Sequence, residues 1–268
     1  RRLIRVRGSY VAYLPKKLMG SLGVEDVEMY WEDDFVGVRP SLARGAGVVE
    51  AEGALAIYLI VAGYAAGLDY LDIAADRSDV ERGLSMVFGR ALERGGVYRI
   101  EYVDRYTDKE EVIGRMLDSL LFLLRGLSAG TATAKTVEAV DDEVDKLRLT
   151  VNRLCTRYPT PKCGFHIQLA RFYERAVDHV AELYRESPDA RIWSVLKDAA
   201  EGLRGALGDM KALADYVAKI PSARFMAMQL SRGEAQAVHS VRVIDYLHNA
   251  AEVYFDIFLY EMGRARGT

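Results

Sequence analysis

From Thr107 onward the sequence reads as one helix after another, and this constrains the fold more than any other feature. Apolar residues recur at helical spacing, and turn residues such as Pro159 and Pro161 interrupt the pattern. Because short turns place consecutive helices side by side, we expect an antiparallel bundle over residues 107–264, within a fold of class α+β, mostly α. The predicted helices span residues 108–126, 132–157, 164–186, 190–206, 208–230 and 232–264.

The beginning of the chain follows a shorter, alternating pattern that is typical of strands and turns. Residues 1–40 predict a compact β unit, in which a short helix begins at Pro15. So few residues bury little core, and we therefore expect this unit to dimerise or to lean on another domain. Its expected strands are Leu3–Arg7, Tyr10–Leu14, Val27–Trp31 and Phe35–Val38.

A linker and a small α/β module are expected between this unit and the bundle. Residues 41–49 are rich in Gly, Ala and Arg, which predicts the linker. Residues 50–105 then alternate between helical and strand patterns, which predicts a small sheet covered on one face. The expected elements are a helix over 52–66, a strand over 69–74, an amphipathic helix over 79–93 and a strand over 97–104.

The composition is that of a globular protein, since half of the 268 residues are hydrophobic and 28% are charged. The longest apolar run, residues 54–68, falls short of the roughly 20 residues of a membrane-spanning helix. The arginine-rich start does not lead into a signal-peptide core. We therefore expect a cytoplasmic protein that is not integral to a membrane. The scarcity of Asn and Gln indicates a thermophilic source.

The charge is unevenly distributed along the chain. Residues 1–24 carry six cations and no acid, whereas the whole chain has a net charge of −3. A basic end on an acidic body favours an anionic partner, with nucleic acid first. The alternative is that these charges only solubilise a small unit. The candidate DNA-binding residues are Arg5, Arg7, Lys16 and Lys17.

Acidic side chains recur four residues apart on three of the predicted helices. Glu174 and Asp178 form one pair, and Asp141 and Asp145 form another. This spacing places both acids of a pair on one helix face, beside the apolar arc. Because the Pro159/Pro161 turn makes the two helices antiparallel, the pairs can converge and bind Fe, Zn, Mn or Mg. A weaker third pair is Asp245 with Asn249.

Other interpretations of these residues remain open. The acids can instead pair with neighbouring cations on a solvated face, which would leave a metal-free helical scaffold. A di-iron or di-manganese enzyme is a further alternative, although only one carboxylate-x-x-His step, Asp245 to His248, is present. Cys155 and Cys163 are compatible with a disulfide or with two free thiols. The cations in question are Lys146, Arg148, Arg171 and Arg175.

The segment Glu174-Arg175-Ala176-Val177-Asp178-His179 resembles the E-R-x-x-D-H signature of the PhoU family. The stretch from Asp141 to Leu147 is similar to the preceding acidic helix of the same repeat. The resemblance covers about residues 108–264 and implies two three-helix repeats whose acidic motifs bind metal clusters. It also implies a non-enzymatic regulator of phosphate uptake, whose partner is a phosphate transporter or a signalling protein.

Residues 1–40 resemble the AbrB/SpoVT swapped-hairpin DNA-binding domain. The matching segments are Arg5-Val6-Arg7-Gly8-Ser9, Leu14-Pro15-Lys16-Lys17, Leu22-Gly23-Val24 and Val38-Arg39-Pro40. This resemblance implies a homodimer that is intertwined through the N-terminal unit. The combination of the two domains is similar to archaeal phosphate-uptake regulators.

The second repeat departs from the PhoU pattern. Its first acidic helix offers Asp215 with Lys219 at the next turn, and Asn249 stands where an aspartate is expected. We therefore expect one good metal cluster, built from the four acids of the first repeat and completed by Asp245. His179 follows Asp178 directly and is either an outer neighbour of this cluster or an exposed side chain.

Overall fold

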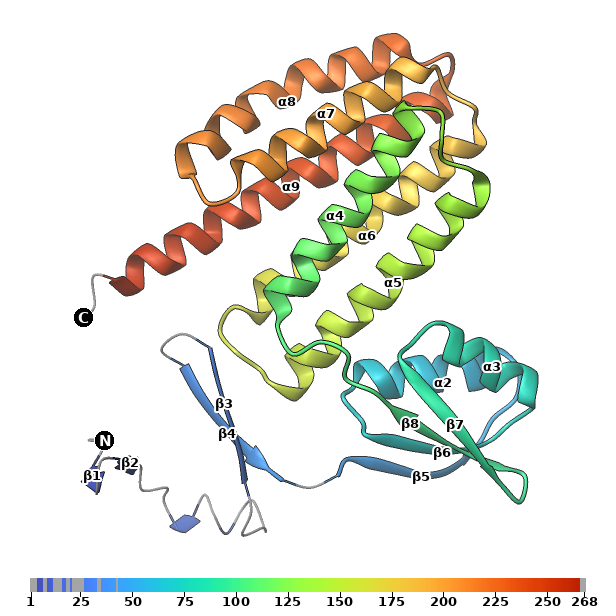
Figure 1. Cartoon of the computed structure of the whole chain (residues 1–268), viewed down its shortest axis with the longest axis vertical. Helices are drawn as coiled ribbons and strands as arrows, with labels where there is room; N and C mark the ends of the chain where they lie inside the picture. Colours follow the sequence, from blue (N-terminus) through green and yellow to red (C-terminus); the bar gives the residue numbers. More distant parts are fainter. Residues whose placement is uncertain are drawn as a thin grey trace.

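Two antiparallel hairpins open the chain (Figure 1). The computed structural model describes residues 4–6, 9–11, 16–17, 20, 27–32, 35–41 and 43–265. Of the predicted short helix, Lys16, Lys17 and Gly20 are described and are helical. The hairpin strands pair as β1 (Ile4–Val6) with β2 (Ser9–Val11) and β3 (Val27–Glu32) with β4 (Phe35–Pro40), in the predicted regions of the chain.

A four-stranded sheet with strand order β5-β6-β8-β7 follows. Strand β5 (Gly45–Glu50) runs parallel to β6 (Tyr70–Ala74), whereas β8 (Val97–Tyr102) is antiparallel to both β6 and β7 (Gly89–Arg94). Helices α2 (Ala54–Ala65) and α3 (Arg77–Ser85) cover one face of the sheet (Figure 1). Burial of apolar side chains between these layers stabilises the module.

Two predictions for this module are wrong. Residues 41–49 are not a linker throughout, because β5 occupies residues 45–50; a side chain at Gly45 would clash with the Tyr70 ring. The helix expected over 79–93 ends at Ser85, and β7 follows it. Gly95 and Gly96 have φ values of 59° and 83°, which suit the two-residue turn that joins β7 to β8. This Gly-Gly pair was the sequence signal for a hairpin.

The six predicted helices of the bundle are confirmed, with small shifts at their ends. Aspartate or threonine side chains cap several of them, as at Asp108, Thr133 and Asp209. Helix α4 begins after Asp108, whose side chain accepts the hydrogen bond from the Glu110 amide. The helices are α4 (Lys109–Ser128), α5 (Ala134–Arg157), α6 (Cys163–Arg185), α7 (Ala190–Ala206), α8 (Met210–Leu230) and α9 (Glu234–Ala265).

The helices pack as two groups of three. Helices α4, α5 and α6 contact one another, as do α7, α8 and α9. The groups join through contacts of α6 with α9 and of α4 with α7 (Figure 1). One continuous apolar core runs through both groups. In the described part of the chain, no helix combines the length and the apolar character that crossing a membrane requires.

Buried arginines attach the N-terminal parts to the bundle. Arg39 of β4 donates to the Arg157 carbonyl oxygen at 3.3 Å and stacks on Tyr158. Arg153, which is 1% exposed, pairs with Asp104 at 2.5 Å and donates to the carbonyl oxygen of Leu68. Through Arg39 the N-terminal unit leans on the bundle, as its small size predicts. Through Arg153 the bundle also holds the α/β module.

Candidate metal centre

Two acid pairs line one side of the contact between α5 and α6. Asp141 and Asp145 come from α5, and Glu174 and Asp178 come from α6; we call these four residues the carboxylate seam. All four side chains are half-buried. The charge of Asp178 acts on the two acids of α5 and on Glu174.

The acids on the α5 side of the seam have no ion-pair partner among the described residues, although the charges of Arg148 and Arg185 act on them from further away. Burial raises the pKa of Asp141 to about 6, and the charges of Asp178 and Asp145 add to the effect. Burial also raises the pKa values of Asp145 and Glu174. Among the described residues, no cation lies within ion-pair distance of Asp141 or Asp145. Glu174 Oε2 is buried and has no hydrogen-bond partner among the described residues, and Arg175 Nε lies 3.6 Å from it. Such oxygens suit a hard cation.

Arginines neutralise part of the α6 side. Arg148 Nε lies 3.2 Å from Glu174 Oε1, and Arg175 Nη1 lies 3.1 Å from Asp178 Oδ2. The alternative interpretation, in which the acids pair with neighbouring cations, therefore holds for two of the four acids. Within the described ranges, Lys146 and Arg171 make no ion pair with the seam.

Asp245 and Asn249 lie on α9, and the ion pair of Asp245 is with α8. Arg224 of α8 places its Nε 2.7 Å from Asp245 Oδ1, and its Nη2 lies 3.3 Å from His248 Nδ1. No hydrogen bond or ion pair between described residues links Asp245 to the carboxylate seam, so its membership of that cluster stays a prediction. Arg224 therefore supplies the positive charge that balances Asp245 at the contact between α8 and α9.

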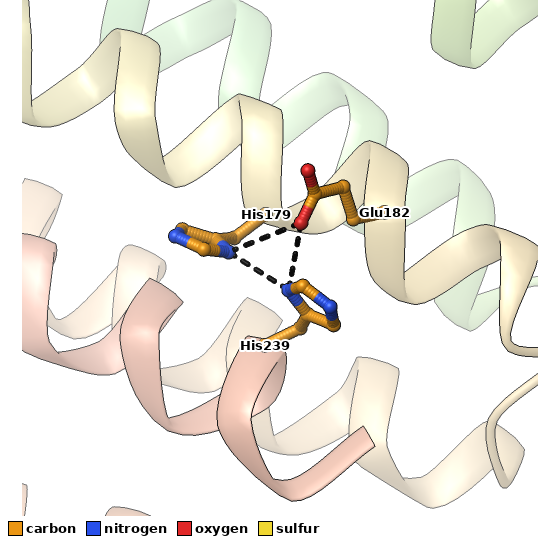
Figure 2. A group of neighbouring side chains, drawn as sticks. All are labelled: His179, Glu182 and His239. Atoms are coloured by element: carbon orange, nitrogen blue, oxygen red, sulfur yellow. Dashed lines mark hydrogen bonds and ion pairs between the residues drawn. The ribbon is translucent and has the colours of Figure 1, made fainter. Parts of the chain in front are cut away.

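A second group of metal-ligating atoms joins α6 to α9. His179 Nδ1 lies 2.9 Å from His239 Nδ1, and Glu182 Oε2 lies 2.9 Å from His239 Nδ1 and 3.7 Å from His179 Nδ1 (Figure 2). We call these three residues the histidine trio. Burial lowers the pKa of His179, and the His239 ring lowers it further, so the ring is neutral at pH 7.

The sequence signal for this trio is weak. His179 and Glu182 are three residues apart on one helix, but His239 is 60 residues further along the chain. Its proximity depends on how α9 lies against α6. Within the described ranges, the trio is the only set of three His, Cys, Asp or Glu side chains whose ligand atoms all lie within 4.8 Å of one another. The oxygens of the carboxylate seam are more widely spaced.

The remaining candidate residues lie elsewhere. Cys155 and Cys163 are buried free thiols near the α5–α6 turn, and a hydrogen bond from the Cys155 thiol lowers the pKa of Cys163 to about 6. Lys16 and Lys17 are exposed. Arg7 and the side chain of Arg5 lie outside the described residues.

Comparison of the chain with family models, with curated proteins and with solved structures finds no match.

Proposed function

We propose that this protein is a non-enzymatic, metal-binding regulator of the PhoU type, in which the carboxylate seam holds hard cations. The observation that carries the proposal is the gathering of four carboxylates from two helices with no ion-pair partner on the α5 side. A bound cation would offset the burial and the neighbouring negative charges that raise the pKa of Asp141. Asp141, Asp145, Glu174 and Asp178 would hold it.

The fold is compatible with this role. Two groups of three helices, each packed within itself, match the pair of three-helix repeats that the resemblance implies. The role in phosphate signalling, with a transporter or signalling protein as partner, rests on the motif of α6. The cation would act as a structural ion that holds α5 and α6 in one arrangement, because no nucleophile with an adjacent base accompanies the described seam.

The first experiment measures metal content. Purified protein is loaded with Mn²⁺ or Fe²⁺, desalted and analysed by elemental analysis, and wild type is compared with the Asp141→Asn/Asp145→Asn variant. Asp256→Asn is the matched control, because Asp256 is an exposed acid on α9. We expect retained metal in wild type and control and a loss in the double variant. Equal metal in all three proteins would contradict the proposal, and peroxide consumption by loaded protein would favour the enzyme alternative.

The N-terminal unit is proposed to bind DNA as a dimer through Lys16, Lys17 and the nearby arginines. Phosphate contacts by these cations should make binding fall steeply as salt rises. Duplex DNA binding is measured between low and moderate salt, for wild type and for Lys16→Ala/Lys17→Ala. Affinity that does not change with salt or with the substitution would contradict this part of the proposal.

A further inference from the structure

We propose that the histidine trio is a second, separate metal site, which takes a borderline first-row divalent ion of the zinc class. Neutral imidazole nitrogen and carboxylate oxygen are the ligands that such ions prefer, whereas the all-oxygen seam suits harder ions. The inference goes beyond the proposed function, because it concerns other residues and another pair of helices.

The spacing of the three ligand atoms fits a single ion. Ligands about 2.0–2.1 Å from a tetrahedral zinc ion lie about 3.3 Å from one another. The three separations in the trio are 2.9, 2.9 and 3.7 Å, which bracket that value. Side-chain movements of a few tenths of an ångström would therefore complete the geometry.

The three ligand atoms already contact one another at the place where a metal ion would bind. The Nδ1 atoms of His179 and His239 lie 2.9 Å apart, and Glu182 Oε2 lies at the same distance from His239 Nδ1. Two ring nitrogens and one carboxylate oxygen thus converge on one place (Figure 2). A divalent ion in that place would satisfy all three.

The surroundings favour binding and access. The ring of His179 stacks on Tyr246 of α9, with ring centroids 5.7 Å apart, and this contact restrains its orientation. The side chains of His179 and His239 are 20% exposed, and that of Glu182 is 48% exposed, so solvent reaches the trio. Three protein ligands leave a fourth position for water. The ion would tie α6 to α9 and hence one group of three helices to the other.

Cobalt titration tests the site, because tetrahedral Co²⁺ absorbs visible light far more strongly than Co²⁺ in an octahedral oxygen site. Chelator-treated full-length protein is titrated with Co²⁺ and then with Zn²⁺. We expect one equivalent of Co²⁺ to give the intense tetrahedral spectrum and Zn²⁺ to displace it. His239→Ala should abolish the spectrum, and Glu182→Gln should weaken Co²⁺ binding at least tenfold. Glu182 is largely exposed, so its substitution tests the site without disturbing the core.

Two controls assign the spectrum to the trio. His248→Ala removes a histidine of α9 that contacts Arg224, and it should leave the spectrum unchanged. Asp141→Asn/Asp145→Asn should also leave it unchanged while it removes Mn²⁺ uptake, so failure of this inference and failure of the proposed function can be told apart. The inference is overturned if wild type gives no tetrahedral spectrum, if His239→Ala retains it, if Glu182→Gln binds Co²⁺ as tightly as wild type, or if either control loses the spectrum.

Discussion

Replacing Asp141 by Asn should stabilise the metal-free protein, although it removes a proposed metal ligand. The pKa of this carboxyl rises from 3.8 to about 6 in the folded state, so folding is disfavoured by the ionised form. At 1.36 kcal/mol for each unit the full penalty is about 3 kcal/mol above pH 6. Because the side chain is half-exposed, solvent screening reduces it to roughly 1 kcal/mol.

The pH dependence gives this prediction its sign. Above pH 6, Asp141 is ionised in both states and the penalty is complete. As pH falls from about 6 to 3.8, the folded carboxyl gains its proton before the unfolded one does, and the penalty disappears. The Asn variant should therefore be more stable than wild type by roughly 1 kcal/mol at pH 7.5 and should show no such advantage near pH 4.

Urea unfolding in EDTA, followed by circular dichroism at both pH values, measures the difference. Saturating Mn²⁺ should reverse the order at pH 7.5, since wild type gains more binding free energy than the variant. Asp256→Asn is the control and should change neither value. If Asp141→Asn destabilises the chelated protein at pH 7.5, the seam is not short of positive charge and the reasoning is refuted.

Two further predictions concern buried groups away from the seam. Burial lowers the pKa of His166 to about 4 in the folded state. As pH falls from 6.5 to 5, the unfolded chain gains a proton that the folded chain does not, so the protein should lose about 2 kcal/mol of stability. Urea unfolding of His166→Leu should not show this loss. Truncating Arg153 to Ala should cost about 3–5 kcal/mol, because it removes a buried cation that pairs with Asp104. A loss below 1 kcal/mol in thermal unfolding would contradict the latter.

The helices of the bundle could be predicted because their signals are local. Apolar periodicity and breaks such as the Pro159/Pro161 turn are properties of neighbouring residues. Strand β5 was missed for the opposite reason. Its Gly- and Ala-rich segment becomes a strand by pairing with β6, and Gly45 is needed because the Tyr70 ring lies beside it. Strand β7 was missed because the helical pattern was extended past Ser85, despite the Gly95-Gly96 turn.

The two candidate sites also differ in how far the sequence predicts them. The proximity of Asp141 to Asp178 follows from helix periodicity and from a short turn, both of which are visible in the sequence. His239 reaches His179 only because α9 packs along α6, which depends on the arrangement of the whole bundle. The ion pair of Asp245 with Arg224 depends in the same way on α8.

The most direct measurement is an anomalous difference map from crystals of the full chain soaked in Mn²⁺. Cation binding by the seam predicts a peak in contact with carboxylates from both α5 and α6, including Asp141 and Glu174. A saturating soak that leaves the seam without a peak, with Arg148 and Arg175 still paired to Glu174 and Asp178, would contradict it.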